Sequence, residues 1–330
     1  LGNWGAPFIE GGHLAVDFFF VLSGFVISRT YGDKIRNGMG FLDFISIRID
    51  RLYPLFLLGL MIGLVRATAQ LVHHHSSLVN PASIAETFAL SIYILPSALM
   101  GNEIFPLNGP SWSLIFEIVA NAFMFALYRN FRRSYLLLAA IAGAIFVVVA
   151  SMHFGTTNIG WGWSNVWGSV PRVCFSFAVG VIISELKLFK YLPANAPGIL
   201  ITAAVCAAFI VPFYDQYRLL FEFACIFLLF PIAVTLGVQS KIPQVLQPVS
   251  SFLGRISYPM YCIHYPISSG VAFLAEKYGV PFWMWGPVLI VFLIVLSDLL
   301  ARTYDVAARH WLSDLKAHWR GPTAPHFPEK

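Results

Sequence analysis

Four ionisable residues inside long apolar runs are the first candidates for chemistry in this sequence. His13 and Asp17 stand four positions apart at the start of one run, so a helix would place them on one face. Glu117 lies six residues into a later run, and His264 lies near the middle of another. A neutral histidine can act as a general base near neutral pH, and a carboxylate can orient it and stabilise its imidazolium. We predict that Glu117, His264, Asp17 and His13 are catalytic residues.

Each of these residues also has a structural interpretation. Glu117 could be satisfied by a neighbouring helix, and His264 could be a core histidine bonded to a carbonyl. Asp17 could hold a helix N-terminus together. Arg172 could pair with a carboxylate, although we favour an interpretation in which its charged end extends to a polar surface. Spacing alone leaves these alternatives open.

The second group of candidates is basic. Arg48 and Arg51 are three positions apart at the expected start of a helix, so they share a face. Planar guanidinium groups suit bidentate phosphate contacts, but the pair could equally be the basic flank of a membrane span. The run His73–His75 is a weak match to a metal site, because adjacent side chains diverge and no acidic partner is near in sequence. We predict a solvated loop there and no metal site.

The composition places these residues in a membrane protein. Of 330 residues, 58% are hydrophobic and only 11% are charged, with a mean hydropathy of +0.73, whereas soluble domains have about 25% charged residues. The net charge of +5 comes largely from basic residues in short connectors rather than from one aqueous face. We therefore predict a lipid bilayer as the surroundings and no nucleic-acid partner.

Crossing the hydrocarbon core takes about 20 apolar residues in a helix. Ten apolar runs in the sequence are candidates for such helices. One of them, residues 84–99, is short, carries Glu86 and ends at Pro96, so we predict a re-entrant or surface helix there. The fold class that follows is all-α, a polytopic transmembrane helix bundle with about nine spans. These lie near residues 14–30, 52–71, 111–129, 134–151, 171–187, 198–213, 219–238, 252–272 and 286–308.

The distribution of Lys and Arg predicts the orientation. If residues 84–99 do not cross, one side receives sixteen basic residues and the other side two, so the first side should be cytoplasmic. Residue 1 then lies outside and residue 330 inside, which leads us to expect one more span upstream. We assign residues 1–312 to the membrane domain and residues 313–330 to a cytoplasmic tail. An outer loop holds three tryptophans that would form an interfacial belt or, alternatively, a wall for a sugar: Trp161, Trp163 and Trp167.

Four stretches in the same order resemble the motifs of the membrane acyltransferase family 3, and together they extend over nearly the whole chain. They are Phe-Phe-Phe-Val-Leu-Ser-Gly-Phe at 18–25, Arg48-x-x-Arg51-Leu-Tyr-Pro, Trp112-Ser113-Leu-x-x-x-Glu117 and Ser257-Tyr258-x-x-Tyr261-x-x-His264.

The resemblance implies a multi-pass O-acyltransferase of the bacterial plasma membrane. Such enzymes move an acyl group, commonly acetyl, from cytoplasmic acyl-CoA to a hydroxyl of a carbohydrate at the outer face. Acyl-CoA is then a co-substrate, and no bound cofactor is implied. The resemblance also implies Arg48 and Arg51 as contacts of CoA and Glu117 as the acidic residue of its motif. The remaining motif residues are candidate substrate contacts: Trp112, Ser113, Tyr258 and Tyr261.

One departure from the family is a missing helix. Family members normally carry a basic residue followed eleven positions later by a histidine regarded as catalytic, and no Arg or Lys here stands eleven positions before any His. We therefore expect the general base upstream of Leu1, with Glu117, His264 and Asp17 orienting it or binding acceptor hydroxyls. Whether this stretch alone is active stays open. A secondary transporter, which would show an internal repeat, and a non-catalytic membrane partner for a lipid-linked sugar are the alternatives.

Overall fold

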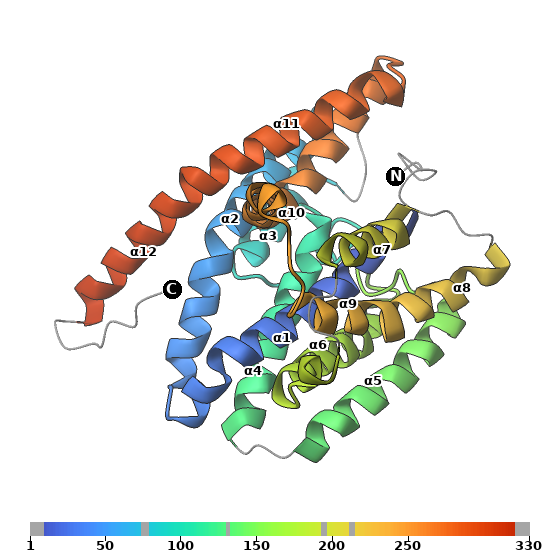
Figure 1. The fold of residues 1–330 in the computed structure, drawn as a ribbon. Helices are drawn as coiled ribbons and strands as arrows, with labels where there is room; N and C mark the ends of the chain where they lie inside the picture. The colour runs from blue at the N-terminus through green and yellow to red at the C-terminus, as the bar shows by residue number, and fades with distance from the viewer. Residues whose placement is uncertain (1–9, 74–78, 130–132, 193–196, 211–214, 321–330) are drawn as a thin grey trace.

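The computed structural model describes residues 10–73, 79–129, 133–192, 197–210 and 215–320, and helices dominate all of these stretches (Figure 1). The α-helices follow one another along the chain as α1 (Ala15–Arg36), α2 (Phe41–His73), α3 (Pro81–Ile92), α4 (Trp112–Arg129), α5 (Arg133–Phe154), α6 (Ser169–Glu185), α7 (Gly198–Ile210), α8 (Asp215–Ala224), α9 (Phe230–Gly237), α10 (Gln247–Lys277), α11 (Phe282–Arg302) and α12 (Tyr304–Arg320). A π-helical turn, Cys225–Leu229, joins α8 to α9. No β-strand occurs in the described stretches, where only isolated bridges are present.

The helices confirm the predicted polytopic bundle. Seven helical stretches among the described residues are long and apolar enough to cross a membrane, and they coincide with seven of the nine predicted spans. The other two predictions, residues 198–213 and 252–272, fall on the 13-residue α7 and within the 31-residue α10. Within the described residues, every predicted span therefore overlaps a helix.

The apolar run at residues 84–99 falls on the short helix α3, which does not cross. Helix α3 has 12 residues, which at about 1.5 Å per residue reach roughly 18 Å, well short of a hydrocarbon core of about 30 Å. Asn80 begins it with a capping box, and Ile94 follows its end with a positive φ of 57°. The prediction of a surface or re-entrant helix over residues 84–99 agrees with this geometry.

Helix directions give an independent check of the number of crossings. Helices α1 and α6 are parallel, because Asp17 bonds Arg172 near their first turns and Arg36 bonds Glu185 at their last. If α2, α4 and α5 cross and α3 does not, the chain reverses direction four times from α1 to α6, and the two helices are parallel. A crossing at α3 would add a fifth reversal and make them antiparallel. The structure therefore confirms the predicted even number of reversals between α1 and α6. The assignment of one side to the cytoplasm stays a prediction.

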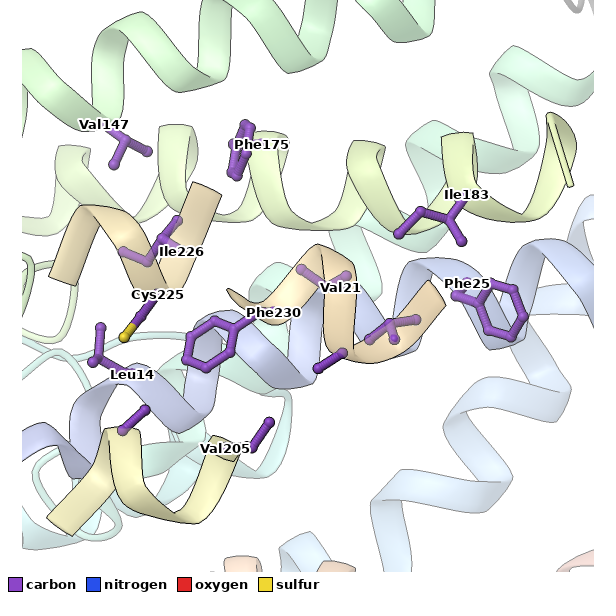
Figure 2. Packing of buried hydrophobic residues seen from close by; sticks show 13 residues of the cluster. Leu14, Val21, Phe25, Val147, Phe175, Ile183, Val205, Cys225, Ile226 and Phe230 are labelled. Atoms are coloured by element: carbon purple, nitrogen blue, oxygen red, sulfur yellow. The ribbon is translucent and has the colours of Figure 1, made fainter. Parts of the chain in front are cut away.

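Helix α1 runs through the middle of the bundle, and α11 and α12 extend along one edge (Figure 1). Figure 2 shows how apolar side chains of α1, α6 and the π-turn–α9 segment face one another, among them Val21, Phe175 and Phe230. The backbones of α1 and α6 approach closely at two glycines, because a Cβ at Gly24 or Gly180 would lie 2.2 or 2.1 Å from a carbonyl oxygen of the other helix. Small residues at such crossings are a normal device of membrane helix packing.

We predict that Gly180→Ala destabilises the fold. The new methyl group would lie 2.1 Å from the carbonyl oxygen of Val21, and because the obstacle is backbone, α1 would have to move away. We expect a loss of about 1–3 kcal/mol, as for other overpacked cores, seen as earlier thermal unfolding in detergent. The matched control is Gly254→Ala, where nothing lies within 4 Å of the added carbon; equal unfolding temperatures for the two variants would contradict the prediction.

One helix start differs from the sequence prediction, while the predicted end of the membrane domain at residue 312 stays a prediction. Helix α2 begins at Phe41, well before the predicted start at residue 52. Its polar first turns are neutralised by tertiary partners, such as Lys316, whose ammonium lies 2.5 Å from Asp50. Helix α12 continues through the predicted boundary at 312/313 to Arg320. The histidine run His73–His75 lies largely outside the described residues.

Candidate functional site

A buried ion pair joins α2 to α4 inside the bundle. The Nη2 atom of Arg48 lies 2.7 Å from Oε1 of Glu117, and the two residues are only 4% and 1% exposed. The hydroxyl of Ser23, from α1, donates to the same oxygen at 3.2 Å. Three helices that are distant in sequence therefore converge on the carboxylate of Glu117.

This ion pair leaves two buried polar atoms without partners. Neither Nε of Arg48 nor Oε2 of Glu117 has a hydrogen-bond partner among the described residues, and the same holds for Oδ1 of Asn121 one turn along α4. Nearly all buried polar atoms in proteins are bonded, and leaving one unbonded costs about 1–3 kcal/mol. A cluster of such atoms around a charged pair is therefore suited to receiving polar groups of a ligand.

The two arginines that were expected to act together differ in burial. Arg48 is buried and turned towards Glu117, whereas Arg51 is exposed. Because α2 begins at Phe41, the two arginines lie well inside the helix rather than at its start. Only Arg51 has the exposure expected of a phosphate contact, and the CoA-binding role of both residues stays a prediction.

The motif residues on α4 and α10 form cross-links between helices. Ser113 and Tyr261 share a hydrogen bond of 2.6 Å between their hydroxyls, and the Tyr261 hydroxyl also donates to the carbonyl oxygen of Pro110. Tyr258 donates to the carbonyl oxygen of Leu52 at 2.5 Å. These hydroxyls are already bonded within the protein, so the substrate contacts predicted for them stay untested. Trp112 is buried, with a guanidinium over its ring.

His264 has a tautomer that its surroundings determine. Its Nδ1 lies 3.0 Å from the carbonyl oxygen of Met260 and 2.9 Å from that of Tyr261. Carbonyl oxygens only accept, so Nδ1 carries the proton, and Nε2 of the neutral ring keeps its lone pair. The rings of His264 and Tyr261 are 6.1 Å apart. The predicted catalytic histidine is therefore set up as a hydrogen-bond acceptor at Nε2.

Asp17 belongs to a second buried ion pair. Arg172 donates from Nε to Oδ1 at 3.1 Å and from Nη2 to Oδ2 at 2.5 Å, and its Nη1 donates to the carbonyl oxygen of Ile159 at 2.6 Å. Both carboxylate oxygens are occupied, and all three guanidinium nitrogens have partners. The expectation that Arg172 extends to a polar surface is wrong, because it is 1% exposed and paired. The geometry describes a brace between α1 and α6, and a catalytic role for Asp17 stays a prediction.

His13 lies in a third cluster, which includes a residue that the sequence analysis missed. Its Nε2 is 3.1 Å from both Oε1 of Glu222 and Oγ1 of Thr157. Glu222 also accepts from Arg218 at 3.0 Å and from the Thr157 backbone N–H at 3.0 Å. Glu222 could have been found by the rule that identified Glu117, since it is a lone carboxylate in an apolar run. Ser23, by contrast, lies inside the stretch at 18–25 that resembles the family, but nothing in the sequence indicated that it contacts Glu117.

The predicted catalytic residues are thus distributed over three places in the structure. Glu117 lies in the Arg48 pair, and His264 lies on α10 beside Tyr261. Asp17 lies in the first turn of α1, and His13 lies in the 3-10 turn, Glu10–Leu14, that leads into it. In the described part of the chain, no group of three or more His, Cys, Asp or Glu residues could hold a metal ion.

Comparison with known proteins extends these observations. A family model described as "Acyltransferase domain" matches residues 2–302. A protein of Rhizobium radiobacter named "Protein 2 in picA locus" is 32% identical over 157 residues, which cover 42% of this chain and 78% of that protein. No solved structure matches the chain.

Proposed function

The chain belongs to the membrane acyltransferase family 3, and on this premise we propose that it transfers an acetyl group from cytoplasmic acetyl-CoA to a hydroxyl of a carbohydrate. Transfer to an exported or cell-surface carbohydrate would take place across the plasma membrane of a bacterium. The family supports acyl transfer and a multi-pass membrane protein; the donor, the acceptor and the acetyl group are part of the proposal.

One observation carries the proposal: the Arg48–Glu117 pair is buried inside the bundle while Nε of Arg48 and Oε2 of Glu117 have no partner among the described residues. Charged groups within membrane helices are costly and tend to be functional. A structural pair would be expected to have these atoms bonded. Free donor and acceptor atoms on a charged pair suit a reaction in which a carbonyl oxygen gains charge and a hydroxyl is held.

The proposed roles follow from these atoms. Arg51, which is exposed, contacts the phosphates of CoA. The Nε–H of Arg48 donates to the thioester carbonyl oxygen and stabilises the charge that develops there, while Oε2 of Glu117 positions the acceptor by accepting a hydrogen bond from a hydroxyl next to the one that is acylated. The C–S bond of the thioester breaks and a C–O bond forms. The hydroxyl proton leaves through a general base, and the thiolate of CoA takes up a proton.

Label transfer tests the proposal directly. The full-length protein, reconstituted in lipid vesicles, is incubated with acetyl-CoA labelled in its acetyl group and with a bacterial polysaccharide preparation. We expect label in the polysaccharide. Passage of the carbohydrate across the vesicle membrane without label would instead support a transporter, and neither label nor passage would contradict the proposal.

We predict that His264→Asn lowers transfer about tenfold, while His264→Gln retains more activity. Asn can replace the Nδ1 donor to the carbonyl oxygens of Met260 and Tyr261 but has no atom at the Nε2 position, whereas the longer Gln side chain can reach that position. Loss of one hydrogen bond of about 1.4 kcal/mol corresponds to tenfold. The measurement is the initial rate of label transfer at several acceptor concentrations. Equal activity of the two variants would contradict a role for Nε2.

A further inference from the structure

A further polar cluster lies in the C-terminal halves of α2 and α10. The hydroxyl of Tyr265 donates to Oε1 of Glu103 at 2.8 Å. Arg66 donates from Nη2 to the carbonyl oxygen of Pro106 at 2.7 Å, and its guanidinium carbon lies 5.9 Å from the centre of the Tyr265 ring. The cluster thus combines a carboxylate, a guanidinium and an aromatic ring, drawn from a loop and two helices.

The opposite charges in this cluster are close but not paired with each other. Arg66 and Glu103 attract one another, yet the hydrogen-bond partners of both are neutral groups. The Nε atom of Arg66 is buried and has no partner among the described residues. A donor and an acceptor held apart in this way can both be satisfied by a group that accepts from one and donates to the other.

Gly109 packs closely against two groups of this cluster. A Cβ at Gly109 would lie 3.1 Å from the ring of Tyr265 and 3.4 Å from Oε2 of Glu103. The first distance is tighter than an ordinary van der Waals contact, so a side chain at this position would displace the ring and crowd the carboxylate. Gly109 therefore sets how closely the loop approaches both groups.

The position of Glu103 is set by two loops that pair with each other. The backbone N–H of Ile104 donates to the carbonyl oxygen of Trp161 at 3.1 Å, and the backbone N–H of Trp163 donates to the carbonyl oxygen of Asn102 at 2.7 Å. An antiparallel bridge forms between Glu103 and Gly162. These bonds hold the carboxylate in place from both neighbouring positions in the chain.

We infer that Glu103, Arg66 and Tyr265 form a binding site for a neutral carbohydrate, the acceptor of the transferred acyl group. A sugar hydroxyl both donates and accepts, so one hydroxyl can donate to Glu103 and accept from Arg66. The two charges cancel, which favours an uncharged sugar. Tyr265 follows His264 on α10, so the site lies within one helical turn of the predicted catalytic histidine along the chain. The inference rests on the proposed function in naming the sugar as the acceptor.

The pKa of Glu103 adds a readout. Burial raises the pKa of this carboxyl, and the hydrogen bond from Tyr265 and the charge of Arg66 oppose that rise without cancelling it. Among the described residues, the charged or titratable groups that act on this carboxyl are Arg66 from α2 and Tyr265 from α10. Binding needs the carboxylate as an acceptor, so we expect it to weaken as the pH falls through a value above the ordinary glutamate pKa of about 4.3.

Saturation-transfer NMR tests the site without requiring catalysis. The full chain in nanodiscs of phosphatidylethanolamine and phosphatidylglycerol is mixed with cellobiose or chitobiose in the absence of acyl-CoA. We expect a saturation-transfer signal from at least one disaccharide, reduced about tenfold by Glu103→Gln and by Gly109→Ala. In Glu103→Gln the dependence on acidic pH should disappear as well.

The control is Gly254→Ala, on the same helix as Tyr265, where nothing lies within 4 Å of an added Cβ. It should bind like the unaltered chain. No signal from either sugar, or equal signals from Gly109→Ala and Gly254→Ala, would overturn the site. Because binding and label transfer are measured separately, binding without transfer would contradict the proposed function and leave the site standing. If Glu103→Gln and Gly109→Ala leave label transfer unchanged, the site is contradicted and the proposed function stands.

Discussion

Glu117→Gln is expected to reduce acyl transfer at least about 100-fold and also to destabilise the protein. The first effect follows if the carboxylate positions the acceptor for the reaction, since misplacing a reacting group by about 1 Å can cost about 10²-fold. The second follows because Arg48 would remain charged and buried without its partner, which typically costs about 3–5 kcal/mol. Thermal unfolding in detergent and the initial rate of label transfer measure the two effects separately.

The double variant Arg48→Gln with Glu117→Gln separates folding from function. It removes both buried charges at once, so most of the lost stability should return, because replacing a whole buried pair by neutral groups is often neutral or stabilising. Transfer should not return, because neither the Nε–H donor nor the carboxylate is restored. A folded and active double variant would show that the pair only supports the fold.

A conservative change supplies the matched control. Arg48→Lys keeps the positive charge opposite Glu117 but has no counterpart of the Nε–H atom, which has no partner among the described residues. We expect this variant to unfold near the temperature of the unaltered chain and to transfer slowly. If Lys at this position supports the full rate, the assignment of Nε to the thioester carbonyl is wrong.

The sequence predicted the spans because each span is a local property. About 20 consecutive apolar residues are needed to cross the hydrocarbon core, and that signal is complete within one window of the chain. The early start of α2 at Phe41 was missed for the same reason. Residues 41–51 include Asp43, Arg48, Asp50 and Arg51, which look like a loop until their tertiary partners are known.

The partners of the candidate residues could not be predicted, because they are far apart in the chain. Arg48 and Glu117 are 69 positions apart, and Asp17 and Arg172 are 155 positions apart. Single-residue rules identified Glu117 and Asp17 as costly but could not tell a functional carboxylate from a structural one. That distinction needs the number of bonds that each group makes. Tyr265 and Gly109 carried no sequence signal, since their significance lies in their contacts with Glu103, which is far from Tyr265 in the chain.

The two buried pairs differ in this respect, although both join helices inside the same bundle. In the Arg172–Asp17 pair both carboxylate oxygens and all three guanidinium nitrogens are bonded. In the Arg48–Glu117 pair one oxygen and one nitrogen are not bonded within the described residues. Complete bonding indicates a brace, because no atom is left to contact a substrate. Incomplete bonding indicates a site.

Arg172→Gln is therefore expected to prevent stable folding, while the double variant Asp17→Asn with Arg172→Gln folds and retains transfer within about threefold. The single change leaves the carboxylate of Asp17, which is fully buried, without its counter-charge. The expected cost of about 3–5 kcal/mol is a large share of the free energy of unfolding of a typical domain, which is about 5–15 kcal/mol. The double change removes the uncompensated charge and keeps polar groups facing each other across α1 and α6.

The comparison of the two double variants tests whether bonding separates a brace from a site. Recovered yield in detergent and unfolding temperature report folding, and label transfer reports activity. If Asp17 takes part in catalysis, as its position in the sequence predicts, the Asp17→Asn and Arg172→Gln double variant would fold and yet be inactive. In that case a fully bonded ion pair would have to open during the reaction, and complete hydrogen bonding would no longer distinguish structural from catalytic carboxylates in this bundle.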